Sequence, residues 1–115
     1  MKGNIVRNEE RFVMRYNSVL DLHTHTVASG HAYCSLREMA KAASEKGLEV
    51  LGITEHAPSM PGTCHKFYFN NLKVVPREMY GIQLLLGSEV NILDAQGTVD
   101  LAQRTLERMD VVIAS

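Results

Sequence analysis

Short apolar runs alternate with mixed, helix-like segments along most of the chain. Four runs have the length of strands, and they predict strands at residues 18–22, 49–54, 83–90 and 111–114. The run at 49–54 is apolar at nearly every position, which is typical of a strand that is buried on both faces. Strands that alternate with helices predict parallel β/α units in one sheet with the helices outside. The pattern therefore predicts the α/β class.

The segments between the strands carry signals for helices and turns. Ser35 and Glu38 form a Ser-x-x-Glu capping box, in which each side chain satisfies a backbone amide of the other residue. Apolar residues then recur at helical spacing, and Gly47 is expected to end this helix. We expect two more helices, at 76–80 and 101–109, and a turn at 94–97.

The two ends of the chain are patterned less clearly. Residues 1–15 are polar, and two interpretations of them stay open. They form either a disordered extension, with Met14 as the true start, or an extension with a short helix over 11–16. At the other end, Ser115 directly follows a strand that no helix covers. We therefore expect residues 16–115 to be a partial domain that is truncated at its C-terminus.

The composition excludes several classes of protein. The chain has 115 residues, 45% of them hydrophobic, and a net charge of -1. The apolar fraction is too high for a disordered protein, and no basic excess exists to bind the phosphates of a nucleic acid. No apolar run approaches the ~20 residues of a membrane span, and we find no secretory signal. The two cysteines form no CxxC pair, so we expect a cytoplasmic protein without a membrane partner.

The most unusual feature is a set of five histidines, all between residues 23 and 65. His23 and His25 follow the first strand, and residues two apart in an extended segment point to the same side. His56 ends the second strand, and Glu89 ends the third. Because the carboxyl ends of parallel strands meet at one edge of a sheet, these side chains are expected to share a rim. Imidazole and carboxylate together suit zinc, manganese or iron, so the pattern predicts a metal-dependent hydrolase.

Each of these residues also has a plainer explanation when it is taken alone. The histidine pair is compatible with solvated loop residues, His31 with a surface residue and Glu89 with a salt bridge. Only their combination at three successive strand ends favours a metal site. The sequence contains no glycine-rich phosphate loop and no Gly-x-Ser-x-Gly motif. A cysteine nucleophile is a weaker alternative, for which Cys64 beside His65 is the better candidate.

Three segments together resemble the PHP family, which is named for polymerase and histidinol phosphatase. They are Asp-Leu-His-Thr-His-Thr-Val-Ala-Ser-Gly-His-Ala-Tyr at 21–33, Gly-Ile-Thr-Glu-His-Ala-Pro at 52–58 and Gly-Ser-Glu-Val-Asn-Ile at 87–92. The chain is most similar to a branch of small bacterial phosphatases, the YcdX type. The resemblance implies that these parallel β/α units form about the N-terminal half of a distorted (β/α)7 barrel.

The resemblance also implies a trinuclear metal site at the mouth of the barrel. By position, His23 and His25 would bind one metal, which Glu89 would bridge to a second. His31 and His56 would bind the third metal. Zinc is the first choice, with manganese or iron as alternatives. The metals would activate water for attack on phosphorus, so the implied reaction is the hydrolysis of a small phosphomonoester.

Other residues are expected to support or modify this chemistry. His65 and Arg77 are expected to contact the substrate, and Lys66 to add positive charge near its phosphate. Glu55 stands where the family usually has aspartate, and its extra methylene is expected to shift a hydrogen bond near the metals. The family's remaining ligands would lie beyond Ser115. Two alternatives to an active phosphatase therefore stay open: an inactive fragment with partial metal binding, and a half-barrel that another chain completes through the open sheet edge.

Overall fold

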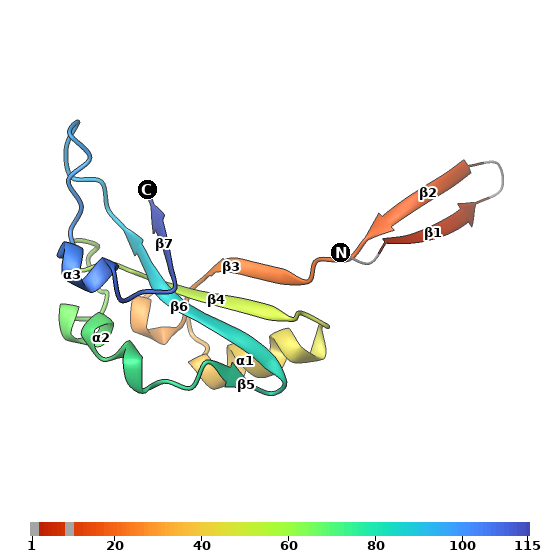
Figure 1. The fold of residues 1–115 in the computed structure, drawn as a ribbon, viewed down its shortest axis with the longest axis horizontal. Helices are drawn as coiled ribbons and strands as arrows, with labels where there is room; N and C mark the ends of the chain where they lie inside the picture. Colours follow the sequence, from red (N-terminus) through yellow and green to blue (C-terminus); the bar gives the residue numbers. More distant parts are fainter. Residues whose placement is uncertain (1–2, 9–10) are drawn as a thin grey trace.

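The computed structural model describes residues 3–8 and 11–115, with a five-stranded sheet at its centre. The sheet curls into a half-barrel, and helices lie between its strands in the sequence (Figure 1). The strands of this sheet are β3 (Leu20–Thr24), β4 (Val50–His56), β5 (Glu78–Met79), β6 (Ile82–Val90) and β7 (Val111–Ala114). The helical elements are α1 (Leu36–Glu45), α2 (Lys66–Asn70), α3 (Gln103–Leu106) and two 3-10 turns, η1 (Val27–Ser29) and η2 (Leu72–Val74). The predicted α/β class and the partial barrel are confirmed.

The register of the parallel strands decides which side chains meet. The seven residues of β4 pair with β6 in an unbroken register that ends with His56 opposite Glu89. β7 pairs in parallel with the second half of β6. β3 pairs with β4 on the other side, with a register shift between Asp21 and Thr24. The carboxyl ends of these strands therefore meet at one edge of the sheet.

The core lies between the sheet and the helices that follow its strands. Leu51 and Ile53 of β4 and Leu84 and Leu86 of β6 are at most 2% exposed. Full burial of such a side chain contributes roughly 1.5–3 kcal/mol, so these two central strands hold the sheet together. The rest of the core cluster consists of Ala40, Ala43, Ala57, Phe69, Leu72, Ile82, Val90 and Leu101.

Helix α1 begins as the sequence predicts. The Ser35 hydroxyl accepts a hydrogen bond from the Glu38 amide at 3.3 Å, and the Glu38 carboxylate accepts one from the Ser35 amide at 2.6 Å. This reciprocal capping box satisfies two amides that have no partner inside the helix. After the helix, Gly47 takes a φ of 82°, a left-handed conformation in which a Cβ would be strained.

The helix predicted at 76–80 is wrong. This segment contains strand β5, which turns back onto β6 through the two residues Tyr80 and Gly81. Both residues have positive φ values, 52° and 76°, as a type I′ hairpin turn requires. The helical element between β4 and β6 is instead α2, followed by η2. Pairing with β6 decides the conformation here, and hydrophobic periodicity does not detect such pairing.

The other helix prediction, at 101–109, is too long. α3 covers only Gln103–Leu106, and its N-cap residue, Ala102, has no side-chain oxygen that could accept an amide. The predicted turn at 94–97 is confirmed, because the Asp94 carboxylate accepts hydrogen bonds from the amides of Gln96 and Thr98. Within the described ranges, no helix is long and apolar enough to cross a membrane.

The N-terminal part of the chain contains a strand pair. β1 (Gly3–Asn8) and β2 (Arg11–Tyr16) are antiparallel neighbours (Figure 1). A strand therefore covers 11–16, where one interpretation of the sequence places a short helix. The division of the chain at residue 16 stays a prediction.

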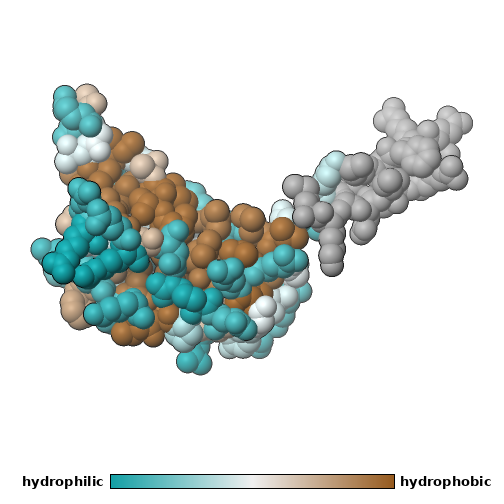
Figure 2. Space-filling model, viewed as in Figure 1, coloured by the Kyte–Doolittle hydropathy of each residue, from teal (hydrophilic) through white to brown (hydrophobic). Residues whose placement is uncertain are grey.

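The outer strands of the sheet leave apolar side chains at the surface. Leu20 of β3 is 51% exposed, and Val112 of β7 is 41% exposed. In Figure 2, hydrophobic residues gather over the sheet, whereas polar residues cover the region around α3. Within the described part of the chain, β3 pairs only with β4, and β7 pairs only with β6. Each of these edges therefore presents unpaired backbone groups.

Candidate metal centre

The carboxyl edge of the sheet carries the four histidines and the glutamate that the sequence singles out. His23 lies near the end of β3, His56 is the last residue of β4, and Glu89 precedes the last residue of β6. His25 and His31 lie in the loop between β3 and α1, on either side of η1. The structure brings all five together, and we refer to them as the histidine rim.

Three imidazole nitrogens of the histidine rim converge on a single oxygen, Oε2 of Glu89. This oxygen lies 2.9 Å from Nε2 of His23 and 3.1 Å from Nε2 of His25. It also lies 3.4 Å from Nδ1 of His56. The other nitrogen of His56 lies 3.3 Å from Nε2 of His31. The rings of His25 and His56 are stacked, with centroids 4.3 Å apart.

These contacts define two groups of three possible ligands: His23, His25 and Glu89, and His25, His31 and His56. Within each group, one ligand atom from each residue lies within 4.8 Å of the others. Nitrogen and oxygen ligands about 2.1 Å from a zinc ion lie roughly 3–4 Å from one another, so small movements of these side chains would let each group hold one ion. The two groups are adjacent because they share His25.

The charge states of the rim suit metal binding. Burial lowers the pKa of His25, and the neighbouring His56 lowers it further, so the ring is neutral and carries a lone pair. Burial raises the pKa of Glu89, but a hydrogen bond from His23 and the charges of the nearby histidines outweigh it, so the net pKa is lowered. Neutral imidazole and ionised carboxylate are the forms that bind metal ions.

One buried atom of the histidine rim forms no hydrogen bond within the described part of the chain, although it lies 3.4 Å from Oε2 of Glu89. Nδ1 of His56 is buried, and no described residue offers it a hydrogen bond. Buried polar atoms in proteins are almost always satisfied, by protein, water or an ion. A divalent cation beside Glu89 would satisfy this nitrogen, so the residues present fit a bound metal. Imidazoles with one carboxylate suit zinc, manganese or iron better than magnesium or calcium, which prefer oxygen ligands.

A fully buried carboxylate, Glu55, lies behind the histidine rim. It accepts hydrogen bonds from both the amide (2.7 Å) and the hydroxyl of Thr26, from the Ser29 hydroxyl at 3.1 Å and from the Tyr68 hydroxyl at 3.4 Å. Burial raises the pKa of Tyr68, and the charge of Glu55 raises it further, so the phenol stays a donor. None of these three partners was predicted from the sequence. Thr26 and Ser29 are hydroxyl residues between histidines of the first motif, which is a signal for two of them, whereas Tyr68 lies outside the three motifs.

Comparison with known families agrees with this arrangement. The family model described as PHP domain matches residues 21–115, a range that contains the whole histidine rim. The chain belongs to the PHP domain family.

Relatives of this PHP domain are named as probable phosphatases. One from Clostridium novyi is 57% identical over 102 residues, which cover 89% of this chain and 41% of that protein. Another from Caldanaerobacter subterraneus is 50% identical over 102 residues, which cover 89% of this chain and 40% of that protein. One from Clostridium botulinum is 52% identical over 102 residues, which cover 89% of this chain and 41% of that protein. The chain therefore spans about two fifths of the length of these relatives.

Two residues that were predicted to lie near the substrate begin helix α2 of the PHP domain. His65 is the exposed N-cap residue, and its Nδ1 accepts a hydrogen bond from the Phe67 amide at 3.1 Å. Lys66 follows as the first residue of the helix and is also exposed. Among the described residues, no hydrogen bond joins His65 to the histidine rim. The roles of both residues toward a substrate stay predictions.

Arg77 lies away from the histidine rim. Its guanidinium donates to Oδ2 of Asp110 at 2.7 Å and to two backbone carbonyls of the segment around η2, both at 2.8 Å. Its own carbonyl accepts a hydrogen bond from Leu84, near the beginning of β6, whereas Glu89 lies near the end of that strand. This position does not support the predicted contact with the substrate. The side chain instead joins the η2 segment to the residue that precedes β7.

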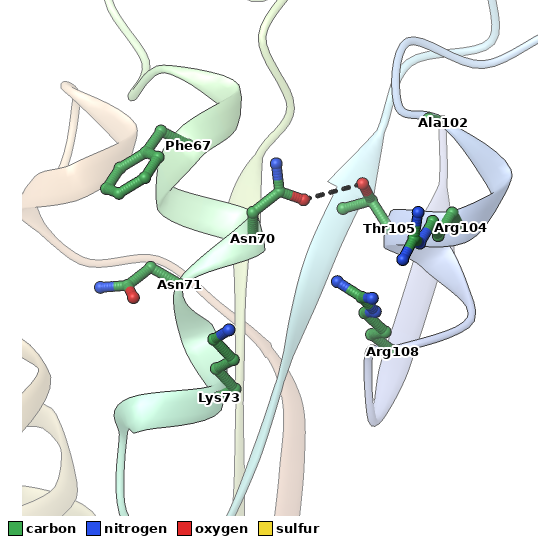
Figure 3. A pocket seen from close by; sticks show the side chains of 8 residues that line it. All are labelled: Phe67, Asn70, Asn71, Lys73, Ala102, Arg104, Thr105 and Arg108. Atoms are coloured by element: carbon green, nitrogen blue, oxygen red, sulfur yellow. Dashed lines mark hydrogen bonds between the residues drawn. The ribbon is translucent and has the colours of Figure 1, made fainter.

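A basic depression lies between α2 and α3 (Figure 3), with a volume of about 500 Å³. Lys73, Arg104 and Arg108 contribute its positive charges. The Thr105 hydroxyl donates to the side-chain oxygen of Asn70 at 2.9 Å, which joins the two helices. None of the residues that line the depression belongs to the histidine rim, so it is separate from the candidate metal centre of the PHP domain.

Proposed function

We propose that this chain binds divalent metal ions at its histidine rim and that the protein hydrolyses small phosphomonoesters in the cytoplasm. The convergence of three imidazole nitrogens on one oxygen of Glu89 carries the proposal. Deprotonated imidazole nitrogens and a carboxylate oxygen that lie this close together can bind one cation between them. The membership in the PHP domain family and the relatives named as probable phosphatases support a phosphatase reaction.

The two ligand groups suggest how the metal ions would be held. His23, His25 and Glu89 would hold one ion, and His31 and His56 would hold another on the other side of His25. For the whole protein we propose up to three ions, with zinc as the first choice and manganese or iron as alternatives. When bound, such ions lower the pKa of water and offset the negative charge of phosphoryl oxygens.

The exposure of the histidine rim suggests the side from which the substrate arrives. The side chains of Glu89 and His56 are each 12% exposed, whereas the side chain of His23 is 51% exposed. The inner residues would therefore keep water away from the ligand atoms, and the rim would be open beside His23. A small phosphorylated molecule would approach from that side.

The direct test is the metal content of the purified chain after exposure to zinc and removal of the excess. We expect at least one zinc ion per chain by elemental mass spectrometry, and its loss when His23→Ala and His25→Ala are combined. The His65→Ala variant is the matched control, since it also removes an imidazole but should keep the metal. Equal zinc in the double variant and the unaltered chain would overturn the proposal. Hydrolysis of p-nitrophenyl phosphate by the loaded chain then tests the reaction.

A second candidate function is metal binding without turnover, or with turnover only in an assembled form. The exposed apolar side chains of Leu20 and Val112 on the two outer strands favour association through these edges. The mass of the metal-loaded protein in solution separates the cases. A monomer with metal but no turnover would indicate a partial site, whereas an active assembly would indicate a barrel that another copy completes.

A further inference from the structure

A chain of hydrogen bonds connects the buried Glu55 with a histidine of the rim. The Ser29 hydroxyl donates to Oε1 of Glu55 at 3.1 Å, and the same oxygen of Ser29 lies 3.2 Å from Nδ1 of His25. It also accepts a hydrogen bond from the backbone amide of His56 at 2.9 Å. Ser29 is 2% exposed and Glu55 is fully buried, so water cannot easily replace either partner.

The direction of each hydrogen bond follows from the number of protons available. All the groups around Glu55 are donors, which is the environment of an ionised carboxylate that can only accept. The hydroxyl of Ser29 has one proton, and it must point to Glu55, because two acceptor oxygens at 3.1 Å would otherwise repel each other. Toward His25, Ser29 can then only accept, so the proton of this contact belongs to the imidazole.

We propose that Glu55, acting through Ser29, is a positioning residue that keeps His25 in the tautomer protonated at Nδ1. Nε2 of His25 then carries the lone pair. This nitrogen lies 3.1 Å from Oε2 of Glu89 but forms no hydrogen bond with it in the described part of the chain, whereas Nδ1 does bond to Ser29, so the geometry places the proton on Nδ1. The inference rests on the proposed function in one respect: this tautomer is useful because it presents an unprotonated nitrogen of His25 to a metal ion. A histidine ligand is commonly oriented in this way by the partner of its other nitrogen.

The same hydroxyl also couples two segments of the histidine rim. Ser29 lies at the end of η1, and the backbone amide that donates a hydrogen bond to its hydroxyl oxygen belongs to His56 at the end of β4. A single side chain therefore holds the loop of the first motif against the end of the second strand. Loss of the hydroxyl should release the ring of His25 and loosen the position of His56 at once.

The tautomer can be measured in the unaltered, metal-free chain by nitrogen-15 NMR of the imidazole rings. The pH should lie well above the ordinary imidazole pKa of about 6.5, so that the rings are neutral. The His25→Ala variant identifies the signals of His25. We expect a protonated Nδ1 and an unprotonated Nε2. A His25 ring protonated mainly at Nε2 in the unaltered chain would overturn the proposal. This measurement requires no substitution of Ser29 or Glu55.

The Ser29→Ala variant tests whether the hydroxyl causes this state. We expect a mixture of tautomers at His25 and a Zn²⁺ affinity that falls about 10- to 100-fold, as for other residues that orient a metal ligand. Ser88→Ala is the matched control, because Ser88 is an equally buried hydroxyl that donates only to the backbone carbonyl of Glu55. Thermal unfolding of both variants shows whether the two substitutions destabilise the fold by the same amount.

The possible results separate the two proposals. Equal losses of Zn²⁺ affinity in the Ser29→Ala and Ser88→Ala variants, with the tautomer of His25 unchanged, would overturn the role of Ser29. An unaltered chain that binds no Zn²⁺ would overturn the proposed metal site, but the tautomer measurement would still decide the role of Glu55 and Ser29.

Discussion

Asp100 offers a test of how a single carboxylate holds two loops together at the carboxyl edge of the sheet. It accepts hydrogen bonds from the amide and hydroxyl of Ser59, at 2.9 and 2.7 Å, in the loop after β4. It also accepts them from the amide and side chain of Asn91, at 2.9 and 2.7 Å, directly after β6. The Asp100→Asn variant replaces an ionised acceptor by a neutral group that also carries two donors. We expect it to destabilise the chain at neutral pH.

The size of the effect follows from the pKa of Asp100. Burial raises this pKa, but the hydrogen bonds from Ser59 and Asn91 outweigh burial and lower it from 3.8 to about 2. Such a fall corresponds to about 2.4 kcal/mol, and solvent screening of this partly exposed group reduces it to about 1 kcal/mol. Because the folded pKa is the lower one, this stability is present above the unfolded value of 3.8. It is lost as the pH falls toward 2.

Urea unfolding of the chain and the Asp100→Asn variant at two pH values measures this effect. The difference in the free energy of unfolding should be about 1 kcal/mol at neutral pH, and about half of it should disappear by about pH 3. Glu78→Gln, at an exposed position of β5, is the control and should change stability by less than about 0.5 kcal/mol. A difference that stays constant between the two pH values would refute the role of the charge.

Three further substitutions test the fold. Gly87→Ala would place a Cβ 1.6 Å from the carbonyl oxygen of Val111, so β7 must move away from β6. We expect a loss of at least about 2 kcal/mol and faster amide exchange in β7, and unchanged exchange would contradict this. Ser35→Ala removes the capping box of α1 and should cost about 1 kcal/mol, measured by thermal unfolding. Asp110→Ala leaves the Leu86 amide and the Arg77 guanidinium without the carboxylate that now accepts from both. It should cost about 2 kcal/mol in urea unfolding, and a smaller loss than for Ser35→Ala would argue against this contact.

Local patterns in the sequence were sufficient for the elements that depend on neighbours in the chain. The capping box at Ser35 and the turn at Asp94 are confirmed, because each requires only residues a few positions apart. The segment at 76–80 was predicted wrongly, because its conformation depends on pairing with β6. Tyr80 adopts a positive φ there, which no periodicity indicates.

The candidate site shows the same division. The meeting of His56 and Glu89 could be predicted, since parallel strands in register bring their carboxyl ends to one edge. The position of Arg77 could not be predicted, because the guanidinium pairs with Asp110, a residue 33 positions away. A basic side chain between the second and third motifs in the sequence is therefore bonded to the residue before β7 and not to the histidine rim.

The sequence by itself determined which ligand types reach the rim of this PHP domain. The spacing of His23 and His25 and the strand ends at His56 and Glu89 depend on the two-residue repeat of a strand and on parallel topology. Only the tertiary structure decided how these groups are held. The link from Glu55 through Ser29 to His25 joins two segments 26 residues apart. Such a contact exists only when the register of the sheet and the burial of the carboxylate bring those segments together.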